Sequence, residues 1–185
     1  MADHPAPKIY TRTGDAGETG LFDNTRVSKA DPRVEVTGEI DELASWLGVV
    51  LAKLSDAELA AMLQQIQRDL FAVGALLADP SRRIAARIEK ATLGPDEVRR
   101  LEDWIDMLEA KVPPLRRFIL SGGAETGALL HLSRSVCRRA ERRVVALGLD
   151  AVPPDVLVYV NRLSDLLFVM ARTVNARQGV PEIEW

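Results

Sequence analysis

Apolar side chains recur along this 185-residue chain at the three- and four-residue spacing of amphipathic helices. The stretch 59–77 is the most regular, because its apolar residues alternate spacings of four and three. Such spacings average about 3.5 to 3.6 residues per turn, which suits helices that pack nearly parallel. The sequence therefore predicts an all-α protein built as a five-helix bundle. Its helices are expected to contain residues 40–54, 59–77, 98–112, 129–147 and 157–174.

Several helix ends can be predicted from capping and helix-breaking residues. Ser55, with Glu58 three residues later, has the pattern of a capping box at the start of the second helix. The run 33–36 weakly favours a strand, and no other run does. The remaining ends are predicted by residues that begin or interrupt helices, namely Pro95, Pro113, Pro114, Gly148, Pro153 and Pro154.

The length of the chain favours a single domain with its own core. Residues 80–94 lack a strong apolar stripe and are expected to be mobile. We expect one helical domain over residues 9–178. The smaller divisions are a flexible N-terminal tail at 1–8, a binding loop at 9–34 within the domain, and a C-terminal tail at 179–185.

Composition and charge are those of an ordinary soluble globular protein. Apolar residues make up 47% of the chain and the formal net charge is −3, which disfavours a general nucleic-acid coat. Cys137 is the only cysteine, so no intramolecular disulfide is possible and a reducing compartment is favoured. Residues 1–8 lack the apolar core of a secretory signal, and no apolar run approaches the roughly 20 residues that span a bilayer. We therefore expect a cytoplasmic protein without membrane association.

A glycine-rich segment before the first predicted helix meets no structural need of a bundle. Residues 10–29 combine glycines at a spacing of three with threonine hydroxyls, Arg12 and Lys29. Glycines let backbone amides approach an anion, and hydroxyls and cations complete a cradle for phosphate. The segment is not a Walker A motif and does not follow a strand. On these residues alone, phosphate binding and a flexible polar loop both remain open.

Three arginines spaced by four residues share one face of the fourth predicted helix: Arg134, Arg138 and Arg142. Like charges at this spacing repel, and Glu141 compensates them only in part. A solvated face with internal ion pairs is the simplest interpretation. Because guanidinium groups also bind polyphosphate through paired hydrogen bonds, a triphosphate, an acidic protein and a nucleic acid are all candidate ligands.

Polar residues on the other helices allow more than one interpretation. Asp41 and Glu42 are expected to pair with arginines, because an unpaired buried carboxylate is unfavourable. Asn161 is either a satisfied core amide or a ligand contact. It shares a face of the fifth predicted helix with Ser164, Asp165, Phe168 and Arg172.

The patterns of common metal sites and hydrolases are missing from the sequence. A di-iron bundle needs Glu-x-x-His pairs, and neither His4 nor His131 has a glutamate three residues before it. One cysteine and two histidines do not supply a zinc cluster. We therefore predict no metal-ligating side chains, and His131 is expected to be structural.

Four sequence blocks together resemble the PduO-type ATP:cob(I)alamin adenosyltransferases. The match extends from Lys8 to about Arg177. The resemblance implies a homotrimer of five-helix, ferritin-like bundles with active sites at the subunit interfaces. The blocks are 8–15 with Gly17, Thr19 and Gly20; Gly38 with 41–43; 118–120 with Gly122 and Gly123; and the arginine helix followed by 159–165.

The resemblance also assigns roles to individual residues. Phe118 would fill the lower face of the corrin and displace its axial base, and Arg134 would pair with Asp41 of a neighbouring subunit. Catalysis is expected to depend on these three residues and on Arg138. The loop that wraps ATP would comprise Thr11, Arg12, Thr13, Gly14, Thr19, Gly20 and Lys29. The helical half of the same nucleotide site would comprise Arg138, Arg139, Ala140, Glu141 and Arg142, with Asn161 as a further contact.

The implied reaction moves the 5′-deoxyadenosyl group of ATP onto the cobalt of cob(I)alamin, which forms adenosylcobalamin and releases triphosphate. The implied partners are ATP, Mg²⁺, cob(II)alamin or cob(I)alamin, and a reductase that supplies an electron. Two positions depart from the family pattern: Ser121, where proline is frequent, and Arg12, where lysine is frequent. A nucleotide-sensing module without turnover is the main alternative. Nucleic-acid binding through the arginine helix is disfavoured by the acidic balance of the chain.

Overall fold

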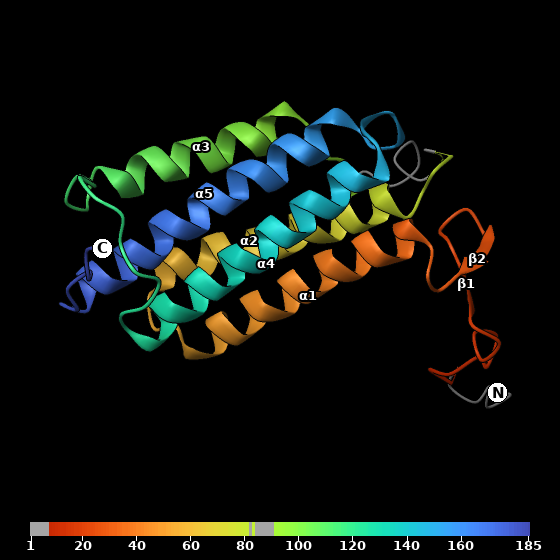
Figure 1. The fold of residues 1–185 in the computed structure, drawn as a ribbon, viewed down its shortest axis with the longest axis horizontal. Coiled ribbons are helices and arrows are strands. Elements are labelled where there is room, and N and C mark those ends of the chain that lie inside the picture. Colours follow the sequence, from red (N-terminus) through yellow and green to blue (C-terminus); the bar gives the residue numbers. More distant parts are fainter. Residues whose placement is uncertain (1–7, 82, 84–90) are drawn as a thin grey trace, which may run out of the picture.

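Five α-helices run side by side along the long axis of the molecule (Figure 1). A computed structural model describes residues 8–81, 83 and 91–185. The predicted all-α bundle of five helices is confirmed. The helices are α1 (Pro32–Lys53), α2 (Ala57–Leu77), α3 (Pro95–Glu109), α4 (Glu125–Leu147) and α5 (Pro154–Arg177), and a 3₁₀ turn, η2 (Leu149–Ala151), precedes α5.

Helix α4 packs against both α1 and α5, and the packing continues from α5 to α3 and from α1 to α2. The apolar stripes of all five helices meet in one core. Complete burial of a leucine side chain stabilises the fold by roughly 1.5–3 kcal/mol. Each helix contributes at least one such side chain to the core, among them Leu43, Leu63, Leu101, Leu130 and Leu163.

A buried polar cluster also joins three of the helices. Asp69 of α2 accepts hydrogen bonds from the Tyr159 hydroxyl of α5 at 2.8 Å and from Arg100 of α3 at 2.6 Å. Burial, together with the neighbouring Asp69 charge, raises the pKa of Tyr159 well above its usual value. Tyr159 therefore stays neutral and donates its hydroxyl proton, which ties α5 to α2 without leaving a buried charge unpaired.

The N-cap of α2 differs from the prediction. Asp56, not Ser55, caps the helix, because its carboxylate accepts the Leu59 amide hydrogen at 3.1 Å. Glu58 does not close a capping box; it forms ion pairs with Arg177 and Lys111 instead. A carboxylate at the N-cap also interacts favourably with the helix dipole, which explains the choice of Asp56.

The strand predicted weakly at 33–36 is wrong. Asp31 accepts the Arg33 amide hydrogen at 2.8 Å and caps α1, which begins at Pro32. The segment before α1 is therefore shorter than the predicted binding loop of residues 9–34. Val36 is completely buried in the core, and this packing outweighs the β-propensity of valine. Two short strands that the sequence did not predict, β1 (Glu18–Gly20) and β2 (Arg26–Ser28), form an antiparallel hairpin ahead of α1.

The C-terminal tail predicted at 179–185 folds back onto the loop between α3 and α4. The Leu120 amide donates to the Ile183 carbonyl at 2.8 Å, and the Trp185 amide donates to the Phe118 carbonyl at 2.9 Å. Most of the segments predicted to be mobile, 1–8 and 80–94, lie outside the described residues. Within the described part of the chain, no helix is long and apolar enough to cross a membrane.

Candidate functional site

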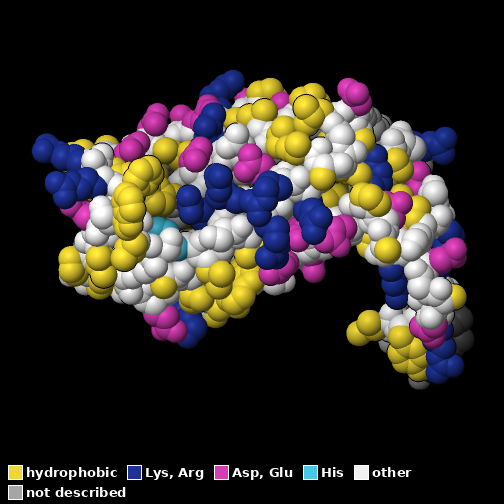
Figure 2. Space-filling view, in the orientation of Figure 1, with side chains coloured by type: hydrophobic (Ala, Val, Ile, Leu, Met, Phe, Trp, Pro, Cys, Tyr) yellow, Lys and Arg dark blue, Asp and Glu magenta, His cyan; other side chains and the backbone are white. Residues whose placement is uncertain are grey.

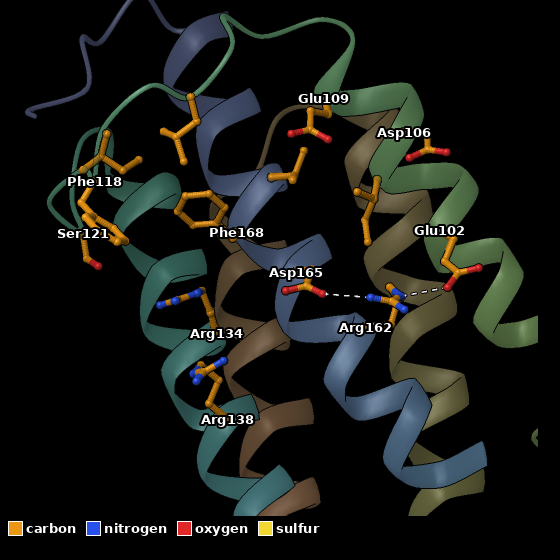
Figure 3. A pocket seen from close by; sticks show the side chains of 14 residues that line it. Glu102, Asp106, Glu109, Phe118, Ser121, Arg134, Arg138, Arg162, Asp165 and Phe168 are labelled. Carbon is orange, nitrogen blue, oxygen red and sulfur yellow. Dashed lines mark hydrogen bonds and ion pairs between the residues drawn. The ribbon is translucent and has the colours of Figure 1, made fainter. Parts of the chain in front are cut away.

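A pocket of about 740 Å³ opens between α3, α4 and α5 (Figure 3). The loop of residues 113–123, hereafter the Phe118 loop, closes one end of it. The pocket thus places Arg134 and Arg138 of α4 in one cavity with the Phe118 loop. Its lining comprises Glu102, Ile105, Asp106, Glu109, Leu115, Phe118, Ile119, Ser121, Arg134, Arg138, Arg162, Asp165, Phe168 and Val169.

Two arginines of α4 give the pocket its positive wall. Arg134 is half-buried and lies over the Phe168 ring, 5.5 Å from its centroid, and Arg138 is exposed one turn later. Neither guanidinium has a carboxylate partner among the described residues. Unpaired guanidinium groups retain their full capacity for charge-assisted hydrogen bonds, so this wall is suited to an anionic ligand.

The opposite wall carries carboxylates that sequence reasoning missed. Glu102, Asp106 and Glu109 project from α3 along the pocket (Figure 3). Glu102 accepts a hydrogen bond from Arg162 at 2.9 Å, and Arg162 also lies 3.3 Å from Asp165. These ion pairs neutralise Arg162, in contrast to the two arginines of α4. The i, i+3 and i, i+4 spacing of the three carboxylates was the signal that could have identified this wall.

The apolar end of the pocket is built around Phe118 and Phe168. Phe118 is 80% exposed on its loop, whereas Phe168 belongs to α5 and packs beside His131, with ring centroids 5.8 Å apart. Figure 3 shows both phenylalanines at the same end of the pocket, beyond Arg134. An exposed aromatic ring at the rim of a cavity is suited to a flat, apolar ligand surface.

His131 is buried, as a structural role requires, but its ring nitrogens have no hydrogen-bond partner among the described residues. Burial and the positive charge of Arg134 lower the pKa of His131. The imidazole is therefore neutral near pH 7 and adds no charge to the pocket.

The glycine-rich N-terminal segment forms a compact turn around Lys29. The Gly17 amide donates to the Gly14 carbonyl at 3.2 Å, and the Lys29 amide donates to the Gly17 carbonyl at 2.9 Å. The backbone of Gly17 has a positive φ of 86°. A Cβ atom at Gly14 would lie 3.3 Å from the Lys29 Nζ atom. The absence of a side chain at Gly14 therefore lets the ammonium group of Lys29 approach the backbone.

Arg12 and the hydroxyls of this segment lie on the same turn. The Thr11 and Thr13 hydroxyl oxygens are 2.9 Å apart, and the Thr13 carbonyl accepts a hydrogen bond from Arg26 at 2.7 Å. Arg12 has φ 61° and lies 5.4 Å from the centroid of the Tyr10 ring. A non-glycine residue in the left-handed region is strained, and such strain is concentrated at functional sites.

The N-terminal segment that contains Arg12, Gly14 and Lys29 is hereafter the N-terminal cradle. Within one chain it does not contact the pocket that contains Arg134 and Arg138, hereafter the arginine pocket. Figure 1 shows the β1–β2 hairpin at the end of the bundle where α1 begins, whereas the Phe118 loop lies at the opposite end. None of the described residues before α1 lines the pocket, and Figure 2 shows the N-terminal segment projecting away from the helices. The predicted Thr19 and Gly20 are part of strand β1 of this hairpin.

Other predicted residues of α4 face away from the pocket. Arg139 donates to Glu39 at 2.6 Å and to Glu42, which raises the pKa of Arg139 and ties α4 to α1. This confirms the expected arginine partner of Glu42. Ala140 is completely buried in the core, so its side chain has no surface to offer a ligand. Neither Arg139 nor Ala140 lines the pocket that contains Arg134 and Arg138.

The remaining predicted residues stay accessible. Glu141 and Arg142 border a shallow groove of about 230 Å³ beside Arg138, and Arg142 donates to the Arg138 carbonyl at 2.9 Å. Asn161 is exposed, so it is not a core amide. Asp41 is also exposed, beside an apolar groove between α1 and α2, and it has no arginine partner among the described residues.

Comparisons with known proteins identify a family and several relatives of the chain. The sequence model of a family described as "Cobalamin adenosyltransferase" matches residues 9–174. A corrinoid adenosyltransferase of Bacillus subtilis (strain 168) is 45% identical over 183 residues, which cover 96% of this chain and 92% of that protein. A cobalamin adenosyltransferase of Cupriavidus metallidurans is 43% identical over 180 residues, covering 96% and 94% of the two chains.

A solved structure is similar over the same length. It is a phenylalanine-to-histidine variant of a PduO-type ATP:corrinoid adenosyltransferase from Lactobacillus reuteri, complexed with cobalamin and ATP. It superposes with a TM-score of 0.89 at 36% sequence identity and covers 96% of each chain. The similarity therefore extends over almost the whole of both chains.

Replacing Arg138 tests whether the positive wall of the pocket binds anions. We expect Arg138→Ala to weaken the binding of inorganic tripolyphosphate at least about tenfold, because a charge-assisted hydrogen bond contributes about 1.5–3 kcal/mol. Isothermal titration calorimetry measures the affinity. Arg99→Ala is the matched control, since Arg99 is an exposed arginine of α3 that contacts Asp96 outside the pocket. Equal affinities for all three proteins would contradict the prediction.

Proposed function

The chain belongs to the cobalamin adenosyltransferase family, and we propose that it transfers the 5′-deoxyadenosyl group of ATP to the cobalt of reduced cobalamin. The observation that carries this proposal is the composition of one pocket, in which unpaired arginines and an exposed aromatic loop lie side by side. The arginines suit a triphosphate, and the aromatic loop suits the face of a corrin ring. A relative from Lactobacillus reuteri binds both ligands together, which supports the same pairing here.

The chemistry of the transfer fits the side chains of the site. Co(I) supplies an electron pair to the 5′-carbon of ATP, a cobalt–carbon bond forms, and the carbon–oxygen bond breaks. The triphosphate leaves with the electron pair of the broken bond. Its developing charge would be stabilised by Arg138 together with Arg12 and Lys29 of the N-terminal cradle. No proton is removed, so the transfer requires no general base from the protein.

Phe118 would act on the cobalt before the transfer. Cob(II)alamin is difficult to reduce while a lower axial ligand donates electrons to the metal. An apolar ring held against the lower face would exclude that ligand and raise the reduction potential of the cobalt, because axial ligation tunes metal potentials. A reductase would then supply the electron.

Two copies of the chain would build each complete site. The N-terminal cradle and the arginine pocket lie apart in one chain, so a neighbouring subunit would have to bring them together. Asp41 and Arg134, both without an ionic partner among the described residues, would pair across that interface. We therefore propose a homotrimer, in which each interface supplies a cradle from one copy and a pocket from the next.

Mg²⁺ would be bound chiefly by the phosphate oxygens of ATP. The described residues contain no group of three or more His, Cys, Asp or Glu side chains that could hold a metal ion. Mg²⁺ commonly binds through substrate phosphates and retains water ligands, so a dedicated protein site is not required. Cytoplasmic location is also part of the proposal, since Cys137 is the only cysteine and is buried.

A spectroscopic assay tests the proposed activity directly. The protein incubated with ATP, Mg²⁺ and chemically reduced cobalamin should convert the cob(I)alamin spectrum to that of an alkylcobalamin, with release of triphosphate. ATP binding without this conversion would instead favour a nucleotide sensor. Replacing ATP by a non-hydrolysable β,γ analogue is a useful control, because the transfer breaks the bond at the 5′-carbon and should still proceed.

Removing the aromatic ring of Phe118 should affect turnover from cob(II)alamin and turnover from cob(I)alamin to different degrees. Phe118→Ala is expected to reduce turnover from cob(II)alamin at least about tenfold more than turnover from cob(I)alamin, since only the former needs a raised reduction potential. Phe22→Ala, a change to an exposed phenylalanine of the N-terminal hairpin, serves as the comparison. Equal losses from both cobalt states in Phe118→Ala would exclude the proposed role of the ring.

Mixed oligomers test whether the site lies between subunits. Arg12→Ala and Arg138→Ala should each be inactive alone. When the two variants are co-expressed, about a quarter of the wild-type rate per site should return, because half of the cradles and half of the pockets are intact at random. Arg12→Ala co-expressed with Lys29→Ala should stay inactive, since both changes lie in the cradle. A mixture of Arg12→Ala and Arg138→Ala without activity would place the whole site in one chain.

A further inference from the structure

Two polar side chains of α5 are almost completely buried beneath the Phe118 loop. Arg172 is 3% exposed and Asn175 is 2% exposed, although both lie in a helix whose other inward positions are mainly apolar. Burial of such groups is unfavourable unless hydrogen bonds replace the lost water. The partners of these two residues therefore show what their burial achieves.

Asn175 holds the end of the Phe118 loop. Its Oδ1 atom accepts the Ala124 amide hydrogen at 3.0 Å, and its Nδ2 atom donates to the Gly122 carbonyl at 3.0 Å. Gly123 has φ +106°, and a Cβ atom there would lie 2.4 Å from the Asn175 amide. Only glycine allows this approach, so the double glycine and Asn175 form one joint between the loop and the first turn of α4.

Arg172 holds the beginning of the same loop and a second segment. Its guanidinium donates to the Pro113 carbonyl at 2.7 Å and to both carboxylate oxygens of Glu182, at 2.8 and 3.0 Å. Glu182 begins the C-terminal segment whose backbone pairs with Phe118 and Leu120. A planar guanidinium can satisfy all three acceptors at once, which a lysine ammonium at this position would not reproduce.

From these contacts we infer that Arg172 and Asn175 are positioning residues, which act through Phe118. Arg172 would fix the beginning of the Phe118 loop and the C-terminal segment that pairs with it, and Asn175 would fix the end of the loop. The inference rests on the proposed function of Phe118. The loop has almost no regular structure and its aromatic ring is exposed, so the helix beneath must supply the rigidity. A misplacement of about 1 Å can reduce the rate about a hundredfold when geometry is decisive. Rigid support of a functional side chain by buried neighbours is the general requirement.

The pocket contacts of the triphosphate do not depend on this support to the same degree. Arg138 lies on α4 beyond the joint at Gly123, and α4 is held independently by its packing on α1 and α5. Loss of Arg172 or Asn175 should therefore affect the reduction of cob(II)alamin more than the transfer from cob(I)alamin. A purely structural role would lower both activities together.

The test compares these two activities in Arg172→Met and Asn175→Ala. We expect the ratio of cob(II)alamin-dependent to cob(I)alamin-dependent turnover to fall about tenfold or more in each variant. Arg177→Ala is the matched control, because Arg177 is an arginine of the same helix that pairs with Asp56 and Glu58 away from the loop. Its ratio should equal that of the wild type. Arg172→Lys should restore the ratio only in part.

A double-mutant cycle separates positioning from a general loss of stability. In the Phe118→Ala background, Arg172→Met should produce no further fall in the ratio, since the residue acts through the missing ring. Electron paramagnetic resonance of bound cob(II)alamin should show a smaller fraction without an axial ligand in Arg172→Met than in the wild type.

The outcomes distinguish a failure of the positioning role from a failure of the proposed function. An unchanged ratio in both single variants, or an additional fall in the Phe118→Ala background, would overturn the positioning role while leaving the proposed activity intact. A wild-type protein that does not alkylate cob(I)alamin would instead refute the proposed function itself. If Arg172→Met lowers stability too far to assay, the ratio in Arg172→Lys decides, because that variant retains the buried positive charge beside Glu182.

Discussion

The packing of α4 against both α1 and α5 is the constraint on which the rest of the structure depends. Successive residues of a helix point in different directions, so neighbours in sequence acquire different roles. Arg139 turns toward α1 and pairs with Glu39 and Glu42, Ala140 enters the core, and Arg138 faces the pocket. One helix therefore contributes an ion pair, a packed surface and a binding wall within three residues.

The distribution of carboxylates decides which arginines remain available to a ligand. Arg139 and Arg162 lie close to acidic partners, whereas Arg134 and Arg138 do not have any among the described residues. An ion pair at a half-exposed site stabilises the fold only modestly, but a guanidinium group in such a pair is no longer available to bind an anionic ligand. The positive wall of the pocket thus consists of two arginines that form no ion pair with a carboxylate in the described part of the chain, although carboxylates line the opposite wall.

The aromatic end of the pocket depends on a different element. The Phe118 loop is joined to α5 through Arg172 and Asn175 and to the C-terminal segment through backbone hydrogen bonds. Helix α5 also contributes two of its own side chains, Phe168 and Asp165, to the lining of the pocket. The proposed triphosphate-binding wall belongs to α4, which packs directly against α5, so this wall and the proposed corrin-binding surface would be held at a constant separation, as a transfer between two large substrates requires.

Apolar periodicity by itself determined the five helices and their order, because these depend on neighbours three and four residues away, and helix-breaking residues indicated several of the ends. The types and spacing of charged residues and glycines also marked the arginine face and the glycine-rich segment as unusual. The N-cap at Asp56 and the hairpin before α1 are local contacts that the sequence patterns did not predict. The burial of Arg172 required the tertiary structure, since its guanidinium binds the Pro113 carbonyl of a distant segment. The same is true of the separation between the cradle and the pocket. Local spacing specifies which side chains share a face, but only the packing of the helices specifies what that face meets.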